Sequence, residues 1–279
     1  MASWFHRLRK ALRSGVAEIP QALWHDTLRT YPFLLRHGAH SGDALRSMAQ
    51  QFLAHKEFHG AAGLVVDDAM AVAIAAQACL PVLGIRSPYR GTAWYQDFVG
   101  IVVYPGAVRA QRESVDADGV VHHFHEVLSG EAMQDGPVTL SWEDVAAAGA
   151  TAAEGYNVVV HEFVHKIDMR SGEADGCPPL PVGFMGCSSN AAARRLWLGG
   201  LRTAHDDFCD RLSLAERFGG APVWLDAYAA HSPGEFFAVA SEAYFVNPAR
   251  LAQEFPALLP LFDAFFRAPG SHAGENPDG

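Results

Sequence analysis

The spacing of hydrophobic residues predicts helices in the first third of the chain. Between residues 21 and 60, apolar side chains recur at steps of three and four, with a loop at 38–42 between two helical stretches. Residues 67–80 are rich in alanine, which predicts a further helix that is buried on most of its surface. The apolar run at 70–85 is interrupted by a glutamine and a proline, and it is shorter than the roughly 20 residues of a membrane span. We therefore expect a buried helix rather than a membrane segment.

The pattern changes to that of a β-sheet between residues 92 and 142. Short runs of β-branched and aromatic residues alternate there with turn signals, which predicts a small sheet. Helical spacing returns at 152–167, and again at 191–218 and 233–267, after a loop-like stretch at 171–190 that is rich in glycine and proline. The sequence therefore predicts an α+β fold that is mostly helical, with a small β-sheet beside the helix at 152–167.

The composition excludes several classes of protein. Apolar residues make up 49% of the 279 residues, which is typical of a globular protein with a sizeable core. Lys and Arg total 21 against 31 Asp and Glu, so the formal charge is −10. Such a charge repels phosphate backbones and anionic lipid head groups, so we expect no direct nucleic-acid partner and no membrane partner.

The ends of the chain differ in composition from its centre. The one basic cluster lies within residues 1–20, and we interpret it as a surface arm, because a charge and a proline interrupt the apolar stretch that a targeting signal needs. Residues 271–279 have the composition of a disordered tail. Residues 21–270 are predicted to form a single domain. Four cysteines without C-x-x-C spacing, in a chain with no secretion signal, favour reduced thiols and a cytoplasmic location.

The helix predicted at 152–167 carries the pattern H-E-x-x-H. It consists of His161, Glu162 and His165, and it places two imidazoles one helical turn apart, where both can bind one Zn²⁺. Glu162 would lie beside the ion and act as general base toward a zinc-activated water. The neighbouring residues are mostly apolar, and buried histidine and glutamate side chains are costly unless they are paired. The motif therefore predicts one zinc ion per chain.

The third zinc ligand has two candidates. The metzincin continuation requires Gly at 168 and His at 171, where this chain has Asp168 and Ser171, so that class is excluded. Glu235 and Glu242 lie seven residues apart on one face of the helix predicted from residue 233, and either carboxylate could complete the site. Glu235 also completes a capping box with the serine three residues before it, which is a purely structural explanation for its position. Spacing alone leaves both candidates open.

Three runs of the sequence resemble those of a known family. The runs HEFVHKID at 161–168, DAYAA at 226–230 and SPGEFFAVASE at 232–242 are similar to those of the Mlc titration factor A family of bacterial zinc-dependent peptidases. The resemblance implies a zincin-like fold akin to lethal-factor-type proteases, with Glu235 as the third zinc ligand and Glu242 orienting a ligand. It also implies that Tyr228 directs its hydroxyl at the substrate oxyanion.

The same resemblance bears on the histidine cluster at 122–125. These residues are predicted to lie in a strand, where alternation prevents all of them from reaching one ion, so solvent-exposed histidines are the simple interpretation. The family pattern, however, implies that His122 reaches the zinc as a fourth protein ligand. Such a ligand would occupy the water position and hold the resting enzyme inactive until the strand moves.

The motif therefore predicts a zinc-dependent enzyme that acts on peptide substrates, and the family resemblance implies that it is aminopeptidase-like, although no residue pattern here fixes exopeptidase over endopeptidase action. Two alternatives remain. One is a non-catalytic protein that binds and sequesters a transcriptional repressor of the Mlc type, and so regulates sugar uptake; that partner is implied by the family's name alone. The other is a closed zinc site that only stabilises the fold. Lys166 and Asp168, which follow the motif, are assigned to structural support at the end of the helix.

Overall fold

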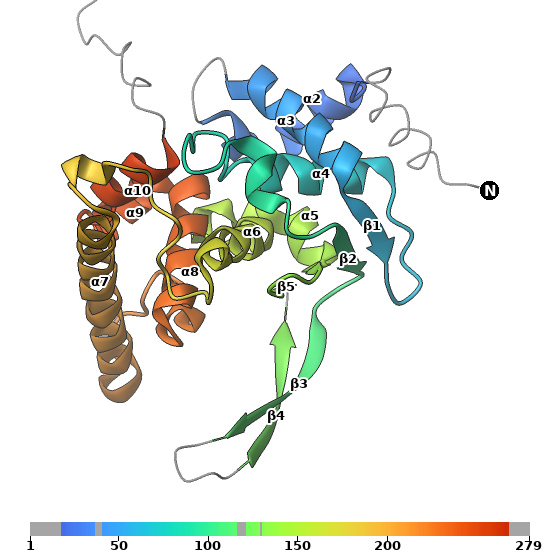
Figure 1. Ribbon diagram of the computed structural model, residues 1–279. Coiled ribbons are helices and arrows are strands. Elements are labelled where there is room, and N and C mark those ends of the chain that lie inside the picture. The colour runs from blue at the N-terminus through green and yellow to red at the C-terminus, as the bar shows by residue number, and fades with distance from the viewer. Residues whose placement is uncertain (1–17, 37–40, 116–120, 129, 268–279) are drawn as a thin grey trace, which may run out of the picture.

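The computed structural model describes residues 18–36, 41–115, 121–128 and 130–267 (Figure 1). The side chains at 41 and 108–129 are outside this description. Most of the predicted basic arm at 1–20, and all of the predicted tail at 271–279, lie outside the described residues.

Three helices from the first third of the chain form one side of the core. They are α2 (Gln21–Thr30), α3 (Ser41–His55) and α4 (Asp68–Cys79), with the 3₁₀ turn η1 (Pro32–Leu35) after α2. Helix α4 is apolar on all sides, and α2, α3, α5 and α6 all contact it, so it is buried as the alanine-rich pattern predicts. Its first turn is fixed by Asp67, whose carboxylate accepts a hydrogen bond from the Met70 amide at 2.9 Å.

A four-stranded sheet has the order β1-β2-β6-β5. Strands β1 (Glu57–Gly60), β2 (Gly100–Tyr104) and β6 (Val138–Ser141) run parallel, and β5 (Gly130–Ala132) joins the edge antiparallel to β6. Strand β1 corrects the expectation of helix up to residue 60, because pairing with β2, some 43 residues away, satisfies its backbone groups in extended form. The aromatic residues near 94 lie in the 3₁₀ turn η2 (Gly91–Tyr95) rather than in a strand.

A second sheet contains two antiparallel strands, β3 (Val108–Val115) and β4 (Val121–Leu128). Their register pairs Ser114 with His122.

Helix α6 (Val158–Asp168) lies between the sheet and the C-terminal helices (Figure 1). It contacts β5 and β6 on one side and α8 (Pro233–Val246) on another. Before it come α5 (Trp142–Thr151) and the turn η3 (Ala152–Glu154). The single helix expected at 152–167 is therefore interrupted, because Gly155 takes a left-handed conformation with φ 83° that ends η3.

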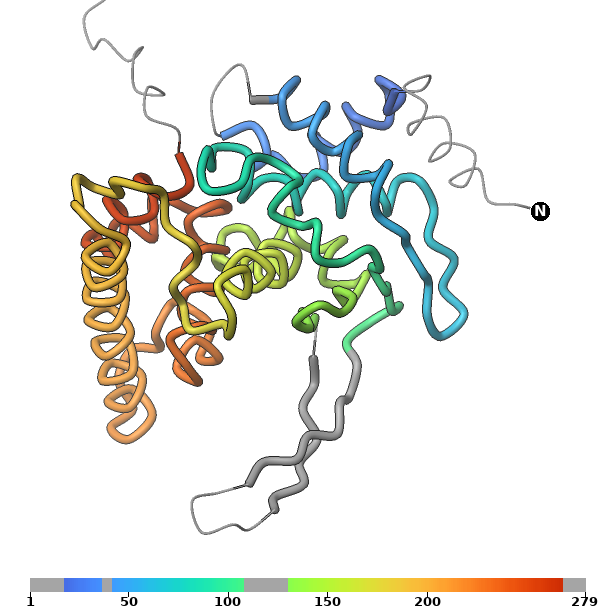
Figure 2. Tube along the Cα trace, in the orientation of Figure 1, coloured from blue at the N-terminus to red at the C-terminus, as the bar shows by residue number. Residues whose placement is uncertain are grey.

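The remaining helices pack on the far side of α8. They are α7 (Asn190–Phe218), α9 (Pro248–Glu254) and α10 (Leu259–Phe266). Short turns complete the chain: η4 (Met169–Ser171), η5 (Phe184–Gly186) and η6 (Ala227–Ala230). Figure 2 shows the blue N-terminal helices and the orange-red C-terminal helices on opposite sides of the yellow-green α6.

The mostly helical α+β fold, with a small sheet beside the H-E-x-x-H helix, is therefore confirmed. In the described ranges, no helix combines the length and the hydropathy that a bilayer crossing requires.

Candidate metal centre

Helix α6 places both motif histidines on the face that meets α8. Its N-cap is Asn157, whose side-chain oxygen accepts a hydrogen bond from the Val160 amide at 2.9 Å. The His161 and His165 rings lie one turn apart, with centroids separated by 4.7 Å. The rest of the helix is mostly buried, so its packing against neighbouring elements fixes the positions of these two side chains.

Helix α8 brings a carboxylate to the two rings from about 70 residues further along the chain. Ser232 caps this helix by accepting a hydrogen bond from the Glu235 amide at 3.1 Å, with Pro233 in the first turn. This cap uses the backbone amide of Glu235 and places the residue in the first turn, where its Oε2 lies 3.1 Å from the Nε2 atoms of both His161 and His165. The structural and the ligand interpretations of Glu235 are therefore compatible.

The geometry of the three donor atoms fits a tetrahedral metal ion. The two Nε2 atoms are themselves 3.1 Å apart, so with Glu235 Oε2 they form a nearly equilateral triangle. Tetrahedral ligands at zinc bond lengths are separated by about 3.3–3.6 Å, only slightly more than these values. Within the described residues, this is the one group of three or more His, Cys, Asp or Glu side chains that could hold a metal ion. Two imidazoles and a carboxylate are also a donor set that suits zinc.

Glu242 takes a different place from Glu235, although the two share a helix face. Its Oε1 lies 2.7 Å from His161 Nδ1, on the side of the ring away from the donor triangle. Its Oε2 accepts a hydrogen bond from the Asn157 amide. The Asn157 side chain in turn donates to Gln77 of α4 at 2.8 Å. A chain of hydrogen bonds thus joins the buried α4 to the His161 ring and fixes the orientation of that ring.

The electrostatics of the centre favour positive charge between its carboxylates. Burial opposes ionisation of Glu235, but its contacts with His161 and His165 outweigh burial and hold its pKa well below the usual range. Burial alone would lower the pKa of His161, but contacts with Glu235 and Glu242 raise it well above 6.5. A proton on the His161 imidazole, or a divalent cation between the side chains, would supply the positive charge that these carboxylates favour.

Glu162 lies at the junction of α6 and the edge strand β5. Its side chain is 4% exposed, and burial raises the pKa of its carboxyl to about 7. A Cβ atom added to Gly130 of β5 would lie 2.4 Å from Glu162 Oε1, so the strand backbone packs directly on this carboxyl group. Glu162 is therefore confined beside the donor triangle.

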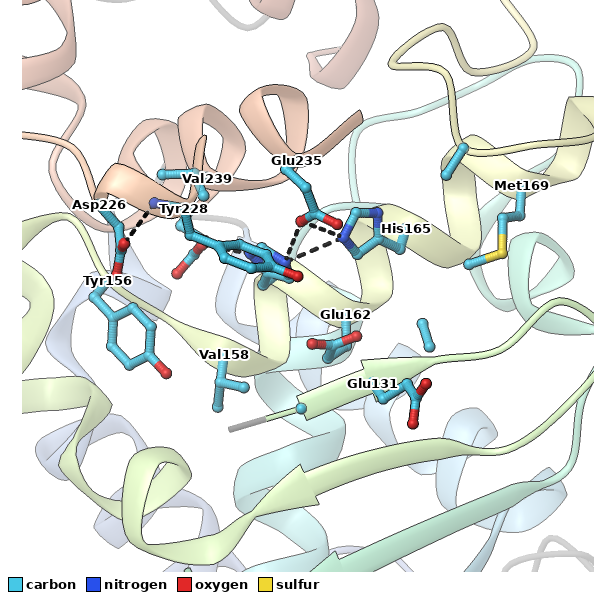
Figure 3. A pocket seen from close by; sticks show the side chains of 15 residues that line it. Glu131, Tyr156, Val158, Glu162, His165, Met169, Asp226, Tyr228, Glu235 and Val239 are labelled. Carbon is cyan, nitrogen blue, oxygen red and sulfur yellow. Dashed lines mark hydrogen bonds and ion pairs between the residues drawn. The ribbon is translucent and has the colours of Figure 1, made fainter. Parts of the chain in front are cut away.

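A cavity of about 500 Å³ opens over these groups (Figure 3). Its walls include the edge strand, α6, α8 and η6. Tyr228 enters from η6, whose first turn is capped by Asp226 through a 2.8 Å hydrogen bond from the Tyr228 amide. Figure 3 shows the Tyr228 hydroxyl directed into the cavity, between Glu235 and Glu162. The cavity brings together five of the six site residues predicted from the sequence: His161, Glu162, His165, Tyr228 and Glu235.

The sixth, His122, is in β4, but its side chain lies outside the described residues. Other histidines have different neighbours. His205 Nε2 is 3.5 Å from Cys209 Sγ on α7, and His231 Nδ1 is 2.9 Å from the Tyr228 carbonyl oxygen. Neither belongs to the three-residue cluster found among the described residues.

The residues after the motif support the end of α6. Lys166 is fully buried and donates hydrogen bonds to the carbonyl oxygens of Met133 and Gly136, in the turn between β5 and β6. Asp168 is also fully buried and accepts a hydrogen bond from the Gly176 amide at 2.7 Å. These contacts are structural, in keeping with the sequence-based expectation.

Sequence reasoning missed four residues around the centre: Gln77, Gly130, Tyr156 and Asn157. Only Asn157 gave a local signal, since asparagine is a favoured N-cap before an apolar helix. The others act through contacts between segments that are distant in the chain.

Comparisons with known proteins agree with the motif. The model of a family described as glucose-regulated metallo-peptidase M90 matches residues 4–267. Proteins named Mlc titration factor A from Salmonella arizonae and Salmonella schwarzengrund are 34% identical to this chain over 246 and 245 residues. Each alignment covers 88% of this chain, and 90% and 85% of those proteins respectively. The protein of the same name from Salmonella typhimurium is likewise 34% identical over 245 residues.

Proposed function

The chain belongs to the glucose-regulated metallopeptidase family M90, and from this premise we propose that it hydrolyses peptide bonds with one Zn²⁺ held by His161, His165 and Glu235. The observation that carries the proposal is the donor triangle, with three interatomic distances of 3.1 Å at the floor of an open cavity. When bound, the ion supplies Lewis-acid activation of water and of the scissile carbonyl group. Within the described residues the ion has three protein ligands, which would leave a fourth position for water, as in catalytic rather than structural zinc sites.

Glu162 is the proposed general base. Its carboxyl group lines the cavity next to the donor triangle, where it can accept the proton of the attacking water and later deliver it to the leaving nitrogen. Burial raises the pKa of Glu162 to about 7, and the positive charge of the ion opposes that rise. Burial thus makes the Glu162 carboxylate a stronger base while the ion favours its ionised form, which suits a group that accepts a proton from water.

Tyr228 is the proposed donor to the developing oxyanion. Its amide is held by Asp226 and its ring is tilted against that of His231, with centroids 4.5 Å apart, so η6 restricts the position of the phenol. A hydroxyl directed into the cavity can donate a hydrogen bond to negative charge on the carbonyl oxygen in the transition state. Tyr228→Phe should therefore lower kcat by about 10²-fold while metal content is unchanged.

Glu242 is proposed to orient His161 rather than to bind the ion. Metal analysis of purified variants tests this assignment: Glu235→Ala should lose bound zinc, whereas Glu242→Gln should retain it with affinity lowered by about 10–100-fold. Loss of zinc from the Glu242 variant alone would reverse the two roles.

There are three finer proposals. Two of them follow from the family resemblance: the enzyme is aminopeptidase-like and acts on short peptides, and it is regulated by His122 as a fourth ligand. The third, a cytoplasmic location, follows from the cysteine pattern instead. Four unpaired cysteines in the described chain support the location. If His122 blocks the water position, His122→Ala should raise peptidase activity; activity at or below that of the unmodified protein, with zinc retained, contradicts this.

A second candidate function is binding of a transcriptional repressor. The relatives are named as titration factors of Mlc, and we extend a repressor partner of that type to this chain only as a proposal. The protein can bind a repressor and also hydrolyse peptides, or repressor binding can be its sole function.

Glu162→Gln separates these functions. A peptidase should keep its zinc and lose turnover of alanine-linked chromogenic peptides by about 10²–10⁴-fold, whereas a pure repressor-binding protein should be unaffected. A zinc site that only stabilises the fold predicts no turnover in the unmodified protein or in His122→Ala. Metal content measured on the same preparations shows whether lost activity reflects lost zinc.

A further inference from the structure

A second cavity of about 430 Å³ adjoins the catalytic one. Tyr156, Asp226, Val239 and Glu242 line both cavities, so the two cavities share a wall. Glu242 also contacts His161 Nδ1 at 2.7 Å, which places the second cavity directly behind a proposed metal ligand. A side chain entering it would therefore belong to a residue next to the bond that is cleaved.

One part of the wall of the second cavity is apolar and aromatic. Trp224, Leu225 and Val239 contribute to it together with the Tyr156 ring. Trp224 is seated against Gly155, where an added Cβ would lie only 2.9 Å from its Cζ2 atom. Gly155 therefore allows the indole to lie close to the start of α6. Aromatic faces of this kind bind aliphatic stems and cationic groups equally well.

The charged groups of the second cavity are all acidic. Glu154 and Asp226 are exposed at its edge, while Glu242 is buried and already bonded to His161 and Asn157. The described lining contains no lysine, arginine or histidine. The catalytic cavity likewise has acidic residues and no lysine or arginine in its described lining. Two carboxylates at the edge of an aromatic cavity complement a long side chain with a cationic end.

We propose that this cavity is a specificity subsite for an arginine or lysine side chain of the peptide substrate. The aliphatic stem lies between Trp224 and Tyr156, and the cationic group pairs with Glu154 and Asp226. The inference rests on the proposed peptidase function and adds the class of substrate. A neutral aromatic side chain would contact the same walls but would give neither Glu154 nor Asp226 a cationic partner, which is why the basic side chain is favoured.

Matched peptides test the charge requirement at constant size. Arginine and citrulline have similar shapes, but only arginine is charged. Two series of alanine-based peptides are therefore compared, in which a single arginine or a single citrulline is placed at each position. We expect kcat/KM to be about tenfold higher for arginine at a single position beside the scissile bond, because each partly exposed ion pair contributes a factor of a few. Product analysis identifies that position.

Variants assign the preference to this cavity. Glu154→Gln should reduce the ratio of kcat/KM for arginine over citrulline by about threefold, and the double variant Glu154→Gln/Asp226→Asn should bring it near one. Using the ratio within each variant cancels changes in the catalytic steps, which matters because Asp226 also caps η6. Asp206→Asn, an exposed site on α7 outside both linings, removes the same charge and should leave the ratio unchanged.

The outcomes separate this inference from the proposed function. Hydrolysis of citrulline peptides with a ratio near one at every position overturns the subsite and leaves the peptidase intact. An arginine preference that survives the double variant also overturns the assignment to this cavity. No hydrolysis of any peptide by the zinc-loaded protein overturns the peptidase function itself, and the subsite with it.

Discussion

At the scale of single residues, Gly130 sets the closest limit on the catalytic geometry. Its α-hydrogen is the largest group that fits against Glu162, because a Cβ would lie 2.4 Å from the carboxyl oxygen and 2.6 Å from Cγ. Gly130→Ala should therefore displace Glu162 while leaving the donor triangle in place. We expect kcat to fall at least tenfold with zinc content unchanged, because small displacements of a general base are costly.

A second glycine provides the control for that variant. Gly199 lies in α7, and a Cβ there would meet no heavy atom within 4 Å. Gly199→Ala should keep full activity and raise the free energy of unfolding by about 0.5–1 kcal/mol, because alanine is the better helix former. Equal activity of the two alanine variants would show that Glu162 tolerates a side chain at position 130.

The residues of the site differ in how far the sequence alone could identify them. His161, Glu162 and His165 lie in one short motif, so helical periodicity is enough to bring them together. Glu235 and Glu242 share a helix face, so the sequence cannot tell their roles apart. Only the folded structure shows that Glu235 contacts the Nε2 atoms of both histidines and that Glu242 contacts His161 Nδ1. Gly130 has no signature, because its role depends on strand β5 meeting a helix about 30 residues further along.

At the scale of elements, Lys166 attaches helix α6 to the turn that carries the edge strand. Its ammonium group donates to the Met133 and Gly136 carbonyl oxygens and lies 4.5 Å from the centre of the Phe98 ring. Lys166→Met should leave both carbonyl groups without this donor and loosen the position of β5. We expect the free energy of unfolding to fall by about 1–3 kcal/mol, and kcat to fall with it.

Lys56 is a matched control that contacts the same aromatic ring. Its ammonium group lies 3.7 Å from the Phe98 centroid, but it donates to the Tyr95 and Phe98 carbonyl oxygens and not to the β5–β6 turn. Lys56→Met should destabilise the fold to a similar degree and leave kcat of the folded enzyme near normal. Chemical denaturation measures the free energy of unfolding of both variants, and peptide hydrolysis measures their kcat. Equal losses of kcat would mean that Lys166 acts on stability alone.

The elements also show where local patterns stop being informative. The helices at 68–79 and 190–218 follow from composition and periodicity, because each has a buried or amphipathic surface of its own. Residues 57–60 look helical when taken alone, yet they form a strand because Phe58 pairs with Ile101. The interruption of the predicted helix before α6 depends on Gly155 and on the Asn157 cap. The spacing of apolar residues contains no information about either.

At the scale of the whole molecule, buried Asp168 links stability to pH. Burial raises the pKa of its carboxyl from 3.8 to about 7, so the folded state holds a proton that the unfolded state releases near pH 4. Its contribution to stability is therefore full below pH 4 and declines as the pH rises toward 7. At about 1.4 kcal/mol per pKa unit, the decline is at most about 4 kcal/mol.

Asp168→Asn removes that dependence on pH. The variant should gain stability relative to the unmodified protein as the pH rises from 4 to 7, because asparagine has no proton to hold. Urea unfolding of both proteins in metal-free form, at several pH values, measures the difference and cancels the titration of groups common to both. A constant difference across this range would mean that Asp168 is ionised in the folded state at low pH.

The placement of the lysines has a consequence for handling the protein. The chain has three, and the two that the structure describes, Lys56 and Lys166, are 4% and 0% exposed and both contact Phe98. Amine-reactive dyes, cross-linkers and activated resins should therefore spare both side chains until the fold opens. Neither described cavity lining contains a lysine, so labelling of the folded protein should leave both cavities unmodified.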